Sequence, residues 1–240
     1  MTPVSRLVRA ANWKYAFGEV LLIVIGISLA LAIDAWREDL SDRIAEREYI
    51  DQLIRDLNST EELMASVAEG NAVADEAAVR LFELFRDNVS VDTQELRRLL
   101  WNSSSFDNPV PVLGTAEALV ATGDLRLIQD SGVRSRVTQY LSHTRDYWLG
   151  TLYTSESRFH ESVDNISRIA ARFGIVPARQ TTANGEREAP DVDGFLNHPD
   201  AFVETQLLGL QRRELAAYRN ETAADAAELR RHLEAYMQRE

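Results

Sequence analysis

The sequence predicts an all-α protein with one N-terminal transmembrane helix, followed by an extracytoplasmic helical bundle of long amphipathic helices. Residues 20–33, VLLIVIGISLALAI, contain no charged side chain. After residue 40, apolar residues recur at alternating steps of three and four, which is typical of helices that bury one face. No segment alternates polar and apolar residues for long enough to predict a strand. The nearest candidate, residues 110–113, contains Pro111, which disfavours a paired strand.

The transmembrane helix is expected over residues 15–36, in contact with the lipid bilayer. Between Tyr15 and Ile33 the only charged side chain is that of Glu19. A stretch of about twenty apolar residues is long enough to cross a hydrocarbon core of about 30 Å. Aromatic side chains favour the two membrane interfaces, and they flank this stretch at Trp13, Tyr15 and Trp36.

The flanking charges predict the orientation of this helix. Arg6, Arg9 and Lys14 precede it without any acidic residue, and a mixed, slightly acidic stretch follows it. Because positive charge is retained in the cytoplasm, residues 1–14 are expected inside and residues 37–240 outside. The predicted location is the bacterial inner membrane, with a single crossing and most of the chain in the periplasm.

A cleaved signal peptide is the alternative for the same segment. A basic start, an apolar run and small residues at Ala30 and Ala32 are all features of such peptides. However, the apolar run is at the upper end of their usual length of roughly 7–15 residues. Helical periodicity also continues past Trp36, which favours an anchor that is retained. Both interpretations export the same part of the chain.

One face of the predicted span is a candidate surface for helix pairing. Glu19, Gly26 and Ala30 are separated by seven and four residues, so they share a helical face. Small residues allow membrane helices to approach closely, and a charge inside the membrane is costly unless it has a role. We therefore expect contact with a second copy or with another membrane protein here. For Glu19 alone, the alternative is that it lies near the cytoplasmic interface and extends to water.

Three long helices are expected after the span, each with an apolar stripe along one side. The first has one polar position in its stripe, Asn71, and a capping box at Ser59–Glu62 that also allows the helix to restart there. The second ends before Gly174, a residue suited to the conformation that terminates helices. The three helices cover residues 40–85, 133–173 and 200–237.

Shorter elements separate these helices. Residues 93–101 predict a short helix, and Thr115 is expected to cap another that ends at Gly123. Ser103–Ser105 are interpreted as part of a flexible linker. Residues 175–198 lack periodicity and contain several prolines and glycines, which predicts a long surface loop within the 37–240 domain.

Composition narrows the classes of function. The net charge is −12, and nearly all the acidic residues follow the span. Because such a surface repels nucleic acid, no nucleic-acid partner is expected. The chain contains no cysteine, which excludes disulfides, thiol catalysis and cysteine-based metal sites.

The remaining residues give little sign of catalysis. The sequence has no nucleophile-elbow, phosphate-loop or zinc-protease motif. Glu156–His160 and Glu228–His232 are acid–imidazole pairs one turn apart, but their spacing differs from that of known di-metal bundles. No metal, cofactor or catalytic residue is therefore predicted. A group of aromatic residues is interpreted mainly as core, with ligand stacking as the alternative: Tyr140, Tyr147, Trp148 and Tyr153.

The segment YAFGEVLLIVIGISLALAIDAWRED resembles the opening of a bacterial family of single-span membrane proteins of unknown function. Residues 117–141 resemble a second family segment that precedes a long helix, whereas Arg37 stands where the family usually has asparagine. The resemblance implies an uncleaved anchor and brings no known activity. The positions that match the family pattern are Gly18, Glu19, Gly26, Ala30, Asp34, Trp36 and Glu38.

Together these features predict a non-enzymatic interaction or scaffold protein held at the membrane by its N-terminal helix. The alternative is a ligand-sensing or ligand-binding module. With only about fourteen residues in the cytoplasm, such a module would need a partner membrane protein to transmit a signal.

Overall fold

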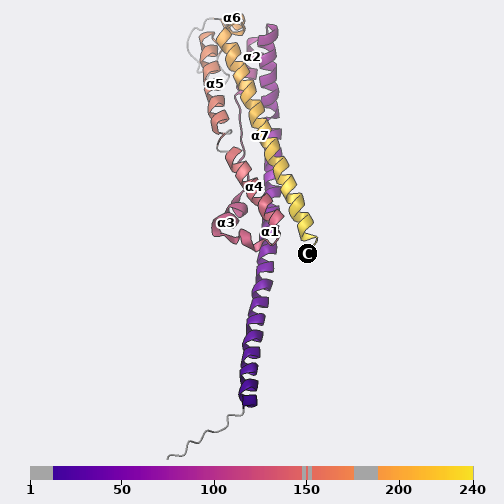
Figure 1. Cartoon of the computed structure of the whole chain (residues 1–240). Coiled ribbons are helices and arrows are strands. Elements are labelled where there is room, and N and C mark those ends of the chain that lie inside the picture. Colours follow the sequence, from indigo (N-terminus) through magenta and orange to yellow (C-terminus); the bar gives the residue numbers. More distant parts are fainter. Residues whose placement is uncertain (1–12, 148–149, 151–152, 176–188, 240) are drawn as a thin grey trace, which may run out of the picture. The chain divides into compact units, whose positions relative to one another are not determined.

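The computed structural model describes residues 13–147, 150, 153–175 and 189–239, and every regular element in these ranges is helical. The predicted all-α class is confirmed for this part of the chain. The elements in order are α1 (Trp13–Asp87), α2 (Thr93–Ser103), α3 (Gly114–Thr122), the 3₁₀ turn η1 (Asp124–Leu127), α4 (Ser131–Tyr147), α5 (Tyr153–Arg172), α6 (Val192–Leu196) and α7 (Pro199–Met237) (Figure 1).

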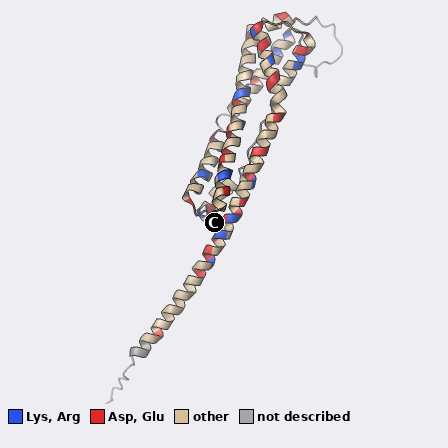
Figure 2. Ribbon diagram, turned by 90° about the vertical axis from the view of Figure 1, so that its right-hand side faces the viewer, with Lys and Arg blue, Asp and Glu red and all other residues tan. Residues whose placement is uncertain are grey.

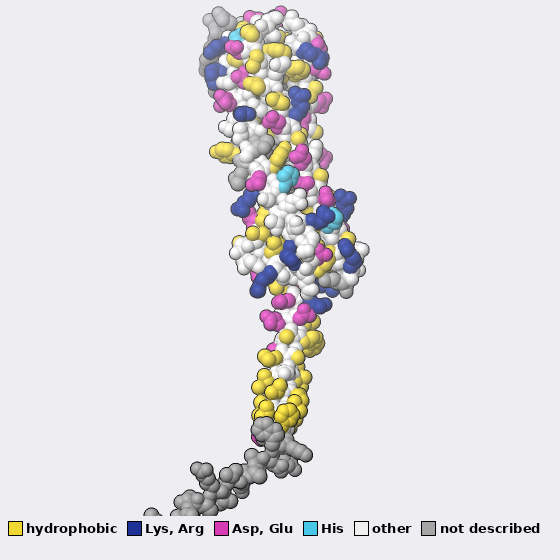
Figure 3. All heavy atoms as spheres, in the orientation of Figure 1, with side chains coloured by type: hydrophobic (Ala, Val, Ile, Leu, Met, Phe, Trp, Pro, Cys, Tyr) yellow, Lys and Arg dark blue, Asp and Glu magenta, His cyan; other side chains and the backbone are white. Residues whose placement is uncertain are grey.

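The chain divides into two compact units, residues 1–48 and 49–240. The described part of the first unit is the beginning of α1, and its large apolar side chains from Phe17 to Ile33 are 48–72% exposed. Figure 3 shows hydrophobic side chains gathered over this segment, and Figure 2 shows few charged residues in it. With a mean hydropathy of 2.2 over its most apolar 18 residues, the helix is long and apolar enough to cross a membrane. Signal sequences meet the same criterion.

The second unit is organised around the rest of α1. Every position of the predicted stripe between Ile50 and Phe85 is buried, including the polar Asn71. The helix continues through Ser59–Glu62, so the capping box there does not begin a new helix. Burying the apolar side chains of this stripe stabilises the unit by roughly 25 cal/mol for each Å² of apolar surface that is removed from water.

Two apolar clusters make up most of the core. One joins the end of α1 to α2, α5 and α6, with Leu81 and Phe159 fully buried. The other joins an earlier part of α1 to α3 and α4, with Ile50 and Val137 fully buried. Among the described elements, only α1 and α7 contribute to both clusters, and they are antiparallel (Figure 1).

The predicted helix over residues 133–173 corresponds to two described helices, since α4 ends at Tyr147 and α5 begins at Tyr153, and residues 148–149 and 151–152 between them lie outside the described residues. Gly150 lies between them in a π-helical turn, and glycine is a weak helix former. The two helices belong to different clusters, so each buries its own stripe. The predicted end at Gly174 is confirmed, since this glycine follows α5 with a φ of 69°.

The predicted loop over 175–198 is wrong at its C-terminal end. Residues 176–188 lie outside the described residues, but Val192–Leu196 form α6. Asp191 caps this helix by accepting a hydrogen bond from the backbone N–H of Gly194 at 2.7 Å. Phe195 and Leu196 are buried, which explains why a segment with so many turn-forming residues is helical.

The expected role of Thr115 is also wrong. Helix α3 begins one residue earlier, at Gly114, and has no side-chain cap. Instead, the backbone N–H of Thr115 donates a hydrogen bond to the Asp56 carboxylate at 3.1 Å. A backbone N–H at the start of α3 is thus hydrogen-bonded to a residue of α1. This partner lies 59 residues away, so local sequence patterns do not reveal it.

Replacing Phe195 by alanine tests the docking of α6. The ring is fully buried and lies in edge contact with Phe85, with ring centres 5.3 Å apart. We expect Phe195→Ala to lower the free energy of unfolding by about 3–5 kcal/mol. The measurement is urea unfolding of the full-length protein in detergent micelles, followed by circular dichroism.

The control for this variant is Val203→Ala. Val203 is 48% exposed on α7, so its truncation should change the stability by less than about 0.5 kcal/mol. Equal effects of the two substitutions would show that α6 does not contribute to the core.

Candidate functional site

The predicted pairing face lies in the exposed segment of α1. Glu19, Gly26 and Ala30 fall on one side of the helix, and all three are exposed. A side chain added at Gly26 would meet no atom within 4 Å. The structure thus places the three residues together on a face that no described part of the chain covers.

A buried polar network is the most distinctive arrangement of charges in the second unit. Arg212 of α7 donates from Nε to the carboxylate of Asp75 in α1 at 2.7 Å. Arg219, two turns further along α7, places a guanidinium nitrogen 3.9 Å from the same carboxylate. The two arginine side chains are each 4% exposed, whereas that of Asp75 is 38% exposed.

The loop after α2 completes this network. Arg212 donates from Nη1 to the backbone carbonyls of Ser103 and Ser105, at 3.2 and 2.7 Å. Ser103 is itself buried and belongs to α2. The interpretation of Ser103–Ser105 as a flexible linker is therefore wrong, because this segment supplies acceptors to a buried cation.

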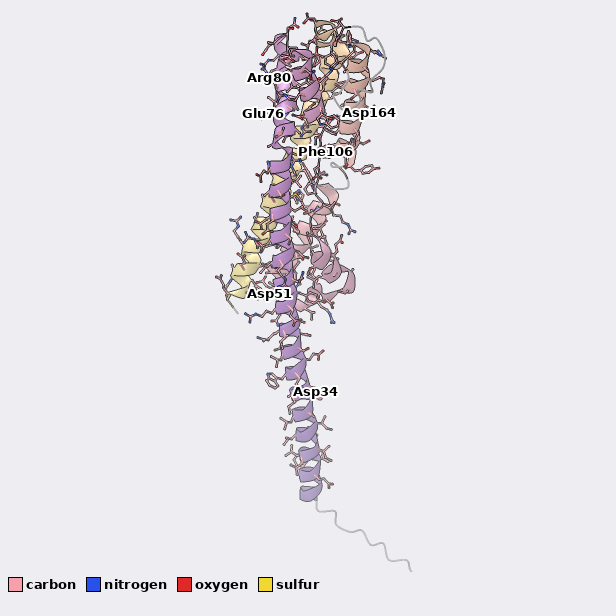
Figure 4. All side chains as sticks on the ribbon, turned by 180° about the vertical axis from the view of Figure 1, so that it is seen from behind. Asp34, Asp51, Glu76, Arg80, Phe106 and Asp164 are labelled. Carbon is pink, nitrogen blue, oxygen red and sulfur yellow. The ribbon has the colours of Figure 1, made fainter. Side chains whose placement is uncertain are left out.

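Asn71 and two aromatic rings hold the same loop in place. The Asn71 amide donates to the carbonyl of Asp107 at 2.9 Å and accepts from its N–H at 3.3 Å. Phe106, labelled in Figure 4, lies 4.9 Å from the ring of Phe159, and the Arg212 guanidinium lies 5.7 Å from that same ring. Hydrogen bonding to the backbone of Asp107 thus explains why a polar residue, Asn71, occurs in the apolar stripe of α1.

The network is rich in positive charge for a buried site. Burial lowers the pKa of Arg212 and of Arg219 below its usual value, while Asp75 acts in the opposite direction. The carboxylate of Asp107 also favours the charged form of Arg219. Even so, Nε of Arg219 has no hydrogen-bond partner among the described residues. An arrangement of this kind fixes the position of α7 against α1 and the loop after α2.

The two acid–histidine pairs are exposed, and each pair lies on a single helix. His160 lies 3.9 Å from Glu156, and His232 lies 3.6 Å from Glu228, with each imidazole more than 40% exposed. The described ranges contain no group of three or more histidine, aspartate and glutamate side chains arranged to hold a metal ion.

The aromatic group divides between core and surface. Tyr140 is buried, and this burial raises its pKa to about 12. Tyr147 stacks on Tyr218 of α7, with ring centres 5.4 Å apart. Tyr153 is 75% exposed and belongs to a different helix from Tyr147, and Trp148 lies outside the described residues. The core interpretation therefore holds for Tyr140 and Tyr147, and it is wrong for Tyr153.

Asp75, Arg212 and Arg219 were not among the candidate residues predicted from the sequence. A signal was present, because Arg212 and Arg219 each lie four residues after a leucine of the apolar stripe of α7, Leu208 and Leu215, and so fit its steps of three and four. Charged residues in register with a buried stripe indicate a buried ion pair when an opposite charge lies on the facing helix.

Replacing Asp75 by asparagine tests the network. The change leaves two almost fully buried guanidinium groups without their shared carboxylate. We expect Asp75→Asn to destabilise the protein by about 3 kcal/mol in urea unfolding, which is the lower end of the cost of breaking a buried ion pair.

Asp87→Asn is the matched control. Asp87 pairs with Arg86 at 2.8 Å, but both side chains are about half exposed. Its loss should cost no more than about 1 kcal/mol. A similar small cost for Asp75→Asn would contradict the structural role of the buried network.

Comparison with known proteins found no relative of this chain. No known protein family, curated protein or solved structure matches the chain.

Proposed function

We propose that the protein is a non-enzymatic interaction component anchored in the bacterial inner membrane by its N-terminal helix. The observation that carries the proposal is the exposed apolar surface from Phe17 to Ile33. Removing each large aliphatic side chain there from water is favourable by roughly 1.5–3 kcal/mol of free energy. A lipid bilayer covers all sides of such a helix at once, and all the backbone hydrogen bonds of a helix are internal.

The flanking charges support an orientation with the N-terminus in the cytoplasm. Arg6, Arg9 and Lys14 precede the apolar segment, and the residues that follow it include Glu38 and Asp39. In this orientation the helical unit of residues 49–240 faces the periplasm. Its strong acidity disfavours nucleic acid and an anionic membrane surface as partners.

The face formed by Glu19, Gly26 and Ala30 is the proposed surface for contact within the membrane. The open space at Gly26 allows a neighbouring helix backbone to approach closely. A second copy of this chain is the simplest partner, because the same small residues would then meet across a symmetric contact.

Fusions at the C-terminus test the topology. Alkaline phosphatase folds only after export, whereas green fluorescent protein exported in unfolded form does not fluoresce. We expect an active phosphatase fusion and a dark fluorescent fusion. The opposite pair of results would place residues 37–240 in the cytoplasm and refute the proposal.

Gly26→Leu tests the membrane contact. Leucine at this position would separate two helices that meet at Gly26, so we expect self-association of the full chain in detergent to weaken about tenfold, measured by analytical ultracentrifugation. Ser28→Leu is the control, since Ser28 lies two residues away on the opposite side of the helix. A monomer that Gly26→Leu leaves unchanged, or equal weakening by both variants, would remove this contact from the proposal.

A further inference from the structure

A groove between α1 and α7 leaves apolar surface uncovered in the helical unit. Its volume is about 680 Å³, within the range of about 300–1,000 Å³ that is typical of small-molecule sites. Val79 and Phe82 of α1 and Leu210 of α7 line it. Val79 is 59% exposed and Leu210 is 47% exposed, so these side chains are not covered by the chain itself.

Gly209 keeps this groove open. It lies inside α7 and lines the groove, and a side chain added to it would meet no atom within 4 Å. Glycine inside a helix is less favourable than alanine. Packing within the chain does not require a glycine at this position, yet its missing side chain leaves the groove wide.

The groove also contains polar groups suited to an acceptor. Thr205 lines it and is 1% exposed, but its hydroxyl has no hydrogen-bond partner among the described residues. Arg212, seven residues further along the same face of α7, also lines it. A buried hydroxyl without a hydrogen-bond partner is unfavourable, so an acceptor that reached it would stabilise this part of the groove.

The charges around the groove leave a positive excess. Asp75 is shared by the two buried arginines, and Glu83 is paired with Arg80 at 3.2 Å. Arg86, which lines the groove, is paired with Asp87. In contrast, Arg213 lines the groove and has no carboxylate within 4 Å among the described residues; its Nε donates only to the carbonyl of Gly209 in its own helix.

We propose that this groove binds a small amphipathic anion, namely a monocarboxylate with an apolar chain or ring. The carboxylate lies near Arg213, and the apolar body lies against Val79, Phe82 and Leu210. In a chain with a net charge of −12, a positively lined apolar groove selects an anion rather than a cation. The site belongs to the helical unit alone and does not depend on the proposed membrane contact.

Calorimetry with matched probes tests the chemistry. The full-length protein in phosphatidylcholine nanodiscs is titrated with octanoate and 2-naphthoate, and then with the neutral isostere 2-naphthalenemethanol and the cation octylamine. Empty nanodiscs provide the background. We expect both anions to bind one per chain and 2-naphthoate to bind at least tenfold more tightly than its neutral isostere. Absence of binding by both anions at millimolar concentration, or equal affinity for the neutral or cationic probe, would overturn the proposal.

Two variants test the location. Gly209→Leu fills the groove while improving helix propensity, so we expect a folded protein that binds the anions at least tenfold more weakly. Arg213→Gln removes an exposed charge and should weaken anion binding severalfold without changing the affinity for the neutral probe. Gly70→Leu is the matched control, because Gly70 is a helical glycine with equally open space outside the groove, and it should bind as the native chain does.

Hydrogen exchange identifies the occupant's position. Binding of 2-naphthoate should slow amide exchange in residues 75–86 and 205–216 of the native chain and not in Gly209→Leu. Unchanged anion affinity in Gly209→Leu would overturn the proposal. A loss of self-association in Gly209→Leu, without any anion binding in the native chain, would instead identify a second copy as the occupant and would also overturn it.

Discussion

The need to bury apolar surface along α1 is the constraint on which the rest of the structure depends. Between Phe17 and Ile33 the apolar side chains surround the helix, and no described part of the chain covers them. Between Ile50 and Phe85 they form one stripe, and this stripe is buried against the other helices. A stripe requires a protein partner on one side, whereas an apolar surface on all sides requires lipid or a comparable environment.

Helix α7 meets this requirement for most of the second unit. It runs antiparallel to α1 and contributes to both apolar clusters, and ion pairs between the two helices accompany it. Arg230 donates two hydrogen bonds to Glu61, at 2.7 and 3.2 Å, near one cluster. Arg212 binds Asp75 nearer the other. Buried or half-buried ion pairs of this kind contribute more to a unique register than to net stability, because removing the charges from water is costly.

Features that depend on one helix at a time were predictable from the sequence. The stripe from Ile50 to Phe85 follows from spacing alone, and α7 was expected within one residue of its observed start. The assignment of α4 and α5 to different clusters was missed because aromatic and apolar spacing continues across Gly150, so local periodicity could not reveal that the two helices bury their stripes in different places. Helix α6 was missed because turn-forming residues surround Phe195 and Leu196, and only tertiary burial explains their conformation.

The candidate sites show the same division. Glu19, Gly26 and Ala30 could be grouped from sequence because they share one face of one helix. Asp75, Arg212 and Thr205 could not, because the first is separated from the others by about 130 residues and the pairing of α1 with α7 is not encoded in any local motif. Likewise, the carbonyl acceptors at Ser103 and Ser105 became meaningful only when a buried guanidinium was found against them.

Extraction of cell membranes with alkaline carbonate, followed by the intact mass of the chain, tests the central claim most directly. If the apolar segment of α1 is a retained anchor, the protein stays in the membrane pellet at its full mass of 27.1 kDa. Release of the protein into the supernatant would contradict the account, and so would a mass that corresponds to a chain cleaved after Ala32.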